Sequence, residues 1–211
     1  MENAVFPDSL ESLDITACPC MLPVFAGRKV HVSWNLALSV KYDYGASDRG
    51  IDIANHMLAE SVSHSMRRLV VGGKDATPPE LITYKGLTHL QLNAPTNAYD
   101  VMEFIHRLPH LVNLYVGCLT PANTQTDFSI PECAEHEPVA PLDTQIRWLS
   151  ISHFEQSKPV KLALSMLKYL MLKIPTLKSV TTLPVLTKQI RAFIDEYVQW
   201  YPHLANVKLM E

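Results

Sequence analysis

The sequence lacks the basic excess that proteins binding polyanions normally carry. Its 211 residues include 18 lysines and arginines against 21 aspartates and glutamates, so the formal net charge at pH 7 is -3. Proteins that bind the phosphate backbone of nucleic acids take much of their affinity from clustered lysine and arginine. The composition therefore predicts that nucleic acid is not a partner.

Long apolar runs and an export signal are also missing. The most apolar segment, PVKLALSMLKYLMLKIP (159–175), is interrupted by three lysines within the length that a bilayer requires. The opening residues, MENAVFPDSLESLD, are acidic where a secretory signal has a basic region followed by an apolar one. We therefore expect no membrane partner and a location in the cytoplasm or the nucleus.

Cysteine is sparse, with four residues in the chain, and no asparagine begins a glycosylation sequon. Both features are typical of an intracellular protein with reduced thiols. The close pair Cys18 and Cys20 lacks a second cysteine pair or well-spaced histidines that would complete a zinc site. We expect neither a metal nor a cofactor.

Motifs of common enzyme classes are absent as well. The chain has no GxSxG, and VVGGKD (70–75) lacks both the earlier glycine and the hydroxyl residue after Lys74 that a phosphate loop needs. His106 and His110 are four residues apart, but Pro109 interrupts the helix that would align them on a metal. A cysteine nucleophile such as Cys118 would need a histidine brought close by folding. We expect no enzyme, and a cysteine- or histidine-dependent enzyme on an α/β scaffold is the alternative.

What the sequence does contain is a six-residue pattern with apolar residues at positions 1, 4 and 6. It recurs, with Thr182 at position 6 of one copy, as LESLDI, MRRLVV, LTHLQL, LVNLYV, IRWLSI, LKSVTT and LANVKL, starting at 10, 66, 87, 111, 146, 177 and 204. The starts are 56, 21, 24, 35, 31 and 27 residues apart, so the first interval is twice 28 and several others are near the period of leucine-rich repeats. Strict apolar alternation over 30–40 predicts a long strand in place of the missing copy, although it does not match the pattern.

A proline stands shortly before several copies of the pattern, in LPHL at 108, IPTL at 174 and YPHL at 201. A helix ends at or before the residue that precedes a proline, so each unit is predicted to be a helix, a proline stop and a short strand. The predicted helices cover about 100–108, where Asp100 and Glu103 suit a capping box, 159–174 from Pro159, and 186–200 with Thr187 as the cap. A weaker helix is predicted at 52–61.

Helices that end in aliphatic-Pro-x-Leu and strands of type LxxLxV resemble the irregular leucine-rich repeats of F-box/LRR proteins, the ribonuclease-inhibitor-like group, and especially their divergent fungal members. The resemblance extends from Phe6 to Leu209. It implies an α/β leucine-rich-repeat solenoid of about seven or eight irregular repeats, with a parallel inner sheet and outer helices, as a single domain over 1–211. The asparagine that often follows the strand in this family is missing, and Asn93 is the nearest case.

Residues 120–144 are rich in proline and acidic residues and lengthen one repeat to 35 residues. They are predicted to be an inserted surface loop. No F-box is visible, because only five residues precede FPDSL. An F-box adaptor is therefore expected as a partner only if an F-box lies in a longer parent chain.

In a solenoid of this kind, positions 1, 4 and 6 point into the core, while positions 3, 5 and 7 point to the concave side. Arginine, tyrosine and tryptophan dominate binding energy at protein interfaces. The predicted partner-binding residues are Arg68, His89, Gln91, Asn113, Tyr115, Trp148 and Ser150. The alternative is that Tyr115 and Trp148 are partly buried against neighbouring strands, because a register assigned from sequence slips easily.

The resemblance implies a protein–protein interaction module that recognises a partner protein on its concave sheet, and more specifically the substrate-receptor part of a ubiquitin ligase. An enzyme requires a concave pocket of small-molecule size lined by converging titratable groups, whereas the interaction hypothesis predicts that no such pocket is present. A structural fragment of a longer chain is a third hypothesis. It is favoured by a chain that stops at the last strand without a polar capping helix.

Overall fold

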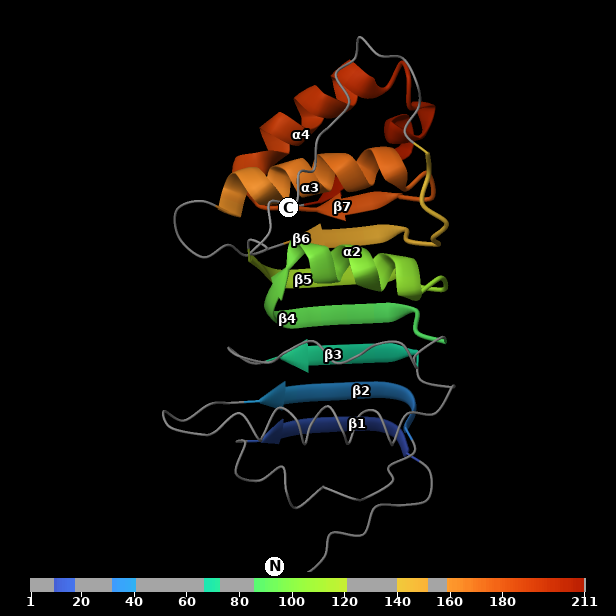
Figure 1. Ribbon diagram of the computed structural model, residues 1–211, viewed down its shortest axis with the longest axis vertical. Coiled ribbons are helices and arrows are strands. Elements are labelled where there is room, and N and C mark those ends of the chain that lie inside the picture. Colours follow the sequence, from blue (N-terminus) through green and yellow to red (C-terminus); the bar gives the residue numbers. More distant parts are fainter. Residues whose placement is uncertain are drawn as a thin grey trace, which may run out of the picture.

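The computed structural model describes residues 10–17, 32–40, 67–72, 86–120, 140–151 and 159–210. These residues build an α/β fold around one parallel sheet (Figure 1). Its eight strands are β1 (Leu10–Ala17), β2 (Val32–Val40), β3 (Arg68–Gly72), β4 (His89–Asn97), β5 (Asn113–Thr120), β6 (Trp148–Ile151), β7 (Ser179–Thr181) and β8 (Lys208–Met210). Each strand pairs with the next one along the chain. The prediction of an α/β fold with a parallel sheet is confirmed.

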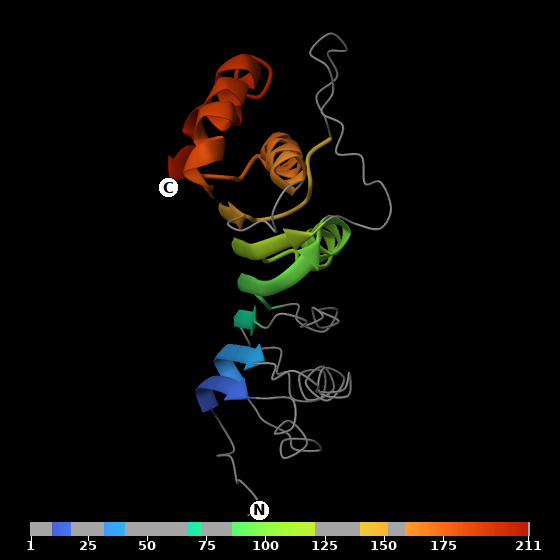
Figure 2. The same ribbon diagram turned by 90° about the vertical axis from the view of Figure 1, so that its left-hand side faces the viewer.

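Helices connect the later strands, because a parallel strand needs a crossover to return to the edge where it starts. They are α2 (Ala98–Arg107), α3 (Pro159–Lys173), α4 (Pro184–Tyr197) and the 3-10 helix η4 (Pro202–Asn206). Figure 2 shows α2 and α3 on the same side of the sheet, with α4 at the opposite end of the molecule from β1. We call the sheet face away from α2 and α3 the open face. The helix predicted at 52–61 lies outside the described residues.

The apolar pattern forms ladders that run across the sheet. The residues at position 4 are register partners from β1 to β8, namely Leu13, Leu36, Leu69, Leu90, Leu114, Leu149, Val180 and Leu209. From Leu69 to Val180 these side chains are buried, and so are the position 1 residues Leu87, Leu111, Ile146, Leu177 and Leu204. They pack against apolar residues of the helices, such as Ile105 and Leu167. The core therefore lies between the sheet and its helices.

Strand β2 occupies the place of the copy that the pattern does not detect. Leu36 pairs with Leu69 and Leu38 pairs with Val71, so β2 has its leucines at positions 4 and 6. Position 1 is then Ser33, and this polar residue is the reason that the pattern fails there. The strand predicted at 30–40 is confirmed as Val32–Val40.

The recurring prolines form turns that lead into the strands. The carbonyl oxygen of the residue before each proline accepts a hydrogen bond from the amide three residues later: Leu108 from Leu111 at 3.0 Å, Ile174 from Leu177 at 3.2 Å, and Tyr201 from Leu204 at 3.0 Å. This bond, with proline at the second position, is the hydrogen bond of a β-turn before β5 and β7, and it opens the 3-10 helix η4 before β8. Each turn delivers a position 1 leucine to the core. Helices α2 and α3 end directly before such turns, as predicted.

Two helices begin earlier than predicted. Helix α2 starts at Ala98, and Asn97 caps it: Asn97 Oδ1 accepts the Asp100 amide at 2.9 Å, and Asn97 Nδ2 donates to Asp100 Oδ2 at 2.6 Å. The reciprocal cap expected between Asp100 and Glu103 is therefore made by Asn97 and Asp100. Glu103 forms an ion pair with Arg107 instead.

The prediction that Thr187 caps the last long helix is wrong. Pro184 begins α4, because its fixed φ suits the first helical position, and Leu183 is the N-cap. Thr187 is buried in the first turn, where its hydroxyl donates to the Leu183 carbonyl oxygen at 3.5 Å. Helix α3 begins at Pro159, as predicted.

The predicted insertion at 120–144 is described only at its two ends. Thr120 is the last residue of β5, and residues 140–147 approach β6 without forming a helix or a strand. The remainder, 121–139, lies outside the described residues. Among the helices that are described, none combines the length and apolar character needed to cross a membrane.

Candidate functional site

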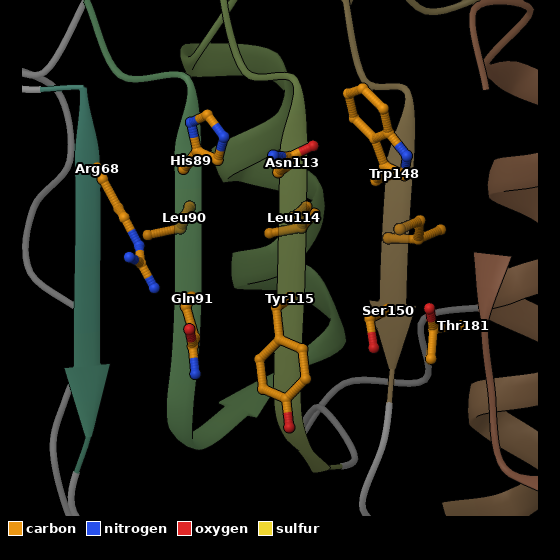
Figure 3. Close-up of a pocket in the computed structure, with 11 residues that line it drawn as sticks. Arg68, His89, Leu90, Gln91, Asn113, Leu114, Tyr115, Trp148, Ser150 and Thr181 are labelled. Carbon is orange, nitrogen blue, oxygen red and sulfur yellow. The ribbon is translucent and has the colours of Figure 1, made fainter. Parts of the chain in front are cut away.

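The open face of the sheet carries a hollow of about 330 Å³ (Figure 3). Side chains from β3 to β7 line it: Arg68, His89, Leu90, Gln91, Asn113, Leu114, Tyr115, Trp148, Leu149, Ser150 and Thr181. All seven residues predicted to bind a partner are in this lining. The structure thus brings them to one place, and their role in binding stays a prediction.

The register of the sheet explains why these residues meet. Arg68, His89, Asn113 and Trp148 are successive Cα partners at position 3, while Gln91, Tyr115, Ser150 and Thr181 are successive partners at position 5. Neighbouring strands lie about 4.8 Å apart, so side chains in one row stand next to each other. Thr181 is not among the predicted binding residues, although its place at position 5 predicts that it points to the concave side. The three leucines were missed because position 4 belongs to the core.

The aromatic side chains of the hollow differ in exposure. Trp148 is 44% exposed, whereas Tyr115 is partly buried. Both side chains are thus partly buried, as the alternative expects, and Trp148 keeps a large exposed area. Figure 3 places Trp148 at the start of β6 and Tyr115 further along β5. The exposed indole is the large apolar surface that the hollow offers to a ligand.

Arg68 and His89 set the charge of the hollow. Burial lowers the pKa of His89 below its usual value of 6.5, and the positive charge of Arg68 lowers it further. The imidazole is therefore neutral at pH 7. Arg68 is exposed and extends from β3 toward β4 (Figure 3), so it supplies the positive charge of the lining.

A short hydrogen-bond chain orients the imidazole. Thr88 Oγ1 lies 2.8 Å from His89 Nδ1 and donates its proton to the Arg67 carbonyl oxygen at 3.0 Å. Because the hydroxyl has one proton, His89 Nδ1 is the donor to Thr88, and we assign the proton of the neutral ring to Nδ1 on this ground. His89 Nε2 is then a hydrogen-bond acceptor.

Amide and hydroxyl groups supply the rest of the polar lining. Gln91 Nε2 donates to Asn93 Oδ1 at 3.1 Å. Asn113 Oδ1 and Ser150 Oγ are buried, and neither has a hydrogen-bond partner among the described residues. A buried polar atom without a partner is destabilising by about 1–3 kcal/mol. The hollow is thus mixed in character, with leucines and aromatic rings among polar groups.

The lining does not assemble acid–base or metal chemistry. Among the described residues, the lining contains no carboxylate or thiol, and no cluster of three or more metal-ligand residues occurs. Ser150 and His89 lie on β6 and β4, two strand spacings apart and two residues out of register, so their Cα atoms are about 12 Å apart and the side chains are beyond hydrogen-bond reach. His106 Nδ1 is 2.7 Å from the Met102 carbonyl oxygen of its own helix.

The volume of the hollow is at the lower end of the range of about 300–1,000 Å³ that is typical of small-molecule sites. A hollow of the size that an enzyme requires is therefore present on this face, where the interaction hypothesis predicted no such pocket. The titratable groups of the lining, Arg68, His89 and Tyr115, do not pair a nucleophile with a base. Size alone thus does not separate the two hypotheses.

Comparison with known proteins adds no relative. No family model matches the chain, and no curated protein or solved structure matches it. Inferences about function consequently start from the open face and its hollow, together with the sequence pattern.

Proposed function

We propose that the chain is a leucine-rich-repeat solenoid of about seven or eight irregular repeats, and that its open face binds a segment of a partner protein. Support for the solenoid comes from strands that pair in sequence order and from buried aliphatic residues at positions 1 and 4 of successive copies of the pattern. The proline turns before β5, β7 and β8 repeat as well. On such a fold, the open face is the concave face.

The observation that carries the binding proposal is an exposed tryptophan at a hollow that also contains tyrosine and arginine. These three residue types dominate binding energy at protein interfaces, especially where a pocket excludes water. Tyr99, Trp148, Val185, Trp200 and Met210 are the exposed large apolar side chains of the described residues, and Trp148 alone among them lines the hollow. A side chain of the partner is expected to enter beside Trp148 and Tyr115.

The resemblance to F-box/LRR proteins supports a more specific role for this face, the substrate-receptor part of a ubiquitin ligase. The partner on the open face is then a substrate protein, and an F-box adaptor is a further partner only if an F-box lies in a longer parent chain. An enzyme has less support, because the described lining holds no nucleophile paired with a base. A location in the cytoplasm or nucleus goes with the proposed role.

Affinity capture from an extract of the source cells tests the proposal. The bait with Tyr115→Ala and Trp148→Ala is compared with the unaltered chain and with a control bait carrying Tyr99→Ala and Trp200→Ala. The control removes the same two side-chain types from α2 and from the turn after α4, where both are exposed. Bound proteins are quantified by mass spectrometry.

We expect a set of partners that the hollow variant loses by about tenfold or more, as for interface hot spots, and that the control retains. For the ligase role, these partners must also become longer-lived in cells that lack the chain. An unchanged partner set on a hollow variant with a native circular dichroism spectrum contradicts binding at this face. Equal losses with both variants contradict it as well.

A further inference from the structure

Cations gather at the edge of the sheet where β3 to β8 begin. We call this edge the entry band, formed by two positions of each repeat: Arg67, Thr88, Val112, Arg147, Lys178 and Val207, followed by Arg68, His89, Asn113, Trp148, Ser179 and Lys208. Residues of the second row are Cα partners across the sheet. The band contains five arginines and lysines and no carboxylate, in a chain whose net charge is -3.

The rows of the band are stacked by backbone hydrogen bonds. The Arg67 carbonyl oxygen accepts the amides of Thr88 and His89 at 2.9 Å, and the Arg147 carbonyl oxygen accepts those of Lys178 and Ser179 at 2.9 and 3.0 Å. The Val112 carbonyl oxygen does the same for the start of β6. Residues far apart in the sequence therefore have fixed neighbours along this edge.

The five cations are exposed and have no carboxylate partner among the described residues. Arg67 Nη1 donates to the Gly86 carbonyl oxygen at 2.8 Å, which leaves its charge uncompensated. Asp143 lies four residues before Arg147, outside the band, in a segment that bonds to the Lys173 carbonyl oxygen at the end of α3. The band is thus positively charged at neutral pH.

The cations form two groups along the entry band, separated by β4 and β5. Arg67 and Arg68 are on the β3 side, and Arg147, Lys178 and Lys208 lead into β6, β7 and β8. Strands β4 and β5, which carry His89 and Tyr115, supply no lysine or arginine to the band. Three strand spacings separate β3 from β6, about 14 Å, which an extended peptide covers with about four residues.

We propose that the partner segment on the open face is an acidic peptide, with carboxylates on both sides of an apolar or aromatic residue that enters the hollow. This inference rests on the proposed function and specifies the partner. Carboxylates placed about four residues apart would lie near the two cation groups, while the central side chain contacts Tyr115 and Trp148. Opposite charges of this kind provide specificity and speed association.

A peptide fits these observations better than a nucleic acid. A nucleic acid carries a charge on every nucleotide, whereas the band is interrupted at β4 and β5 over a hollow with leucines in its lining. The net charge of -3 also opposes a long polyanion. A short segment with carboxylates at two places needs only the two cation groups.

Fluorescence polarisation with three labelled peptide pools tests the inference on the full chain. All pools have the same length, one central tryptophan and random small residues, and differ only at two flanking positions, which are both glutamate, both glutamine or both lysine. A labelled single-stranded oligonucleotide of similar length is the fourth probe. We expect the glutamate pool to bind about tenfold more tightly than the glutamine pool, with an advantage that shrinks as salt is raised.

Charge reversal locates the binding. Arg68→Glu and Arg147→Glu, each checked for a native melting curve, are expected to weaken binding of the glutamate pool by about tenfold. Arg191→Glu, on the exposed surface of α4, is the matched control and should leave binding unchanged. Arg68→Glu and Arg147→Glu are tested separately, so that misfolding of one variant does not decide the result. The protein that carries both substitutions is expected to bind the lysine pool more tightly than the glutamate pool.

Equal affinity for the glutamate and glutamine pools overturns the inference, as does an equal loss with Arg191→Glu. Tighter binding of the oligonucleotide than of the glutamate pool overturns it in favour of nucleic acid. These outcomes concern only the acidic character of the partner segment. If captured partners still depend on Tyr115 and Trp148, the proposed function stands even when the inference about an acidic peptide fails. An unchanged partner set in the capture experiment counts against the proposed function itself.

Discussion

Gly117 on β5 passes so close to Leu92 on β4 that a Cβ atom at position 117 would lie 3.1 Å from the Leu92 carbonyl oxygen. The same atom would lie 3.1 Å from Asn93 Cα and 3.3 Å from Tyr115 Cε1. Carbon atoms in ordinary contact are about 3.5–4.0 Å apart, and backbone neighbours are unable to rotate away. The register between β4 and β5 is regular up to Leu92 and shifts before Pro95, directly after this contact.

Gly117→Ala is therefore expected to lower the free energy of unfolding by about 1–3 kcal/mol, the range for overpacking at a close contact. Urea denaturation followed by circular dichroism measures the change. Ser150→Ala is the control on the neighbouring strand: its buried hydroxyl has no partner among the described residues, so its removal should leave the free energy of unfolding unchanged or raise it. A Gly117→Ala variant as stable as the native chain would contradict the close approach of the two strands.

Loss of the Asn97 cap should destabilise helix α2. Asn97→Ala removes the acceptor of the Asp100 amide and is expected to lower the free energy of unfolding by about 1 kcal/mol. Asn97→Ser keeps a side-chain acceptor and should retain most of that stability. Chemical denaturation of the three proteins in parallel measures the effect, and equal losses in both variants would show that the cap does not depend on the side-chain oxygen.

His89 should make stability depend on pH. Its folded-state pKa is lowered from 6.5, first by burial and then by Arg68, so between the lowered pKa and 6.5 the unfolded chain binds more protons than the folded one. Stability is therefore complete above about pH 6.5 and decreases as the pH falls through this window. His89→Gln, compared with the native chain by urea denaturation at several pH values, should remove this part of the decrease.

Arg68→Gln provides a second check on the same residue. It removes the nearby positive charge but leaves the burial of His89 in place, so the acid-induced loss of stability should become smaller without disappearing. An identical pH profile for the native chain and His89→Gln would contradict the assigned cause. If Arg68→Gln leaves the dependence of stability on pH unchanged, burial alone is the cause of the lowered His89 pKa.

Much of the fold follows from local sequence. The spacing of apolar residues at positions 1, 4 and 6 predicts the strands, because alternate residues of a strand face opposite sides of the sheet. Leu90 and Leu114 are buried as this phase requires. The prolines predict where α2 and α3 end, since the ring blocks continuation of a helix. The start of α2 was predicted two residues too late, because Asn97 and Asp100 are both residue types that cap helices and the sequence does not rank them.

The composition of the candidate site also follows from the register. Adjacent strands from β3 to β6 pair at equivalent positions of the pattern without a shift in the described rows, apart from the end of β4. Residues at positions 3 and 5 in the sequence, including His89 and Tyr115, are therefore neighbours in space. The pattern did not detect the copy at β2, because position 1 of that copy is the polar residue Ser33 instead of an apolar one.

The sequence by itself determined which residues face the core and which face the open side, because strand alternation and proline turns act over a few neighbouring residues. Only the tertiary structure decided how close separate strands come, as at Gly117 and Leu92. It also decided the lowered pKa of His89. These properties depend on distances between residues that are remote in the chain, and no local pattern of residue types specifies them.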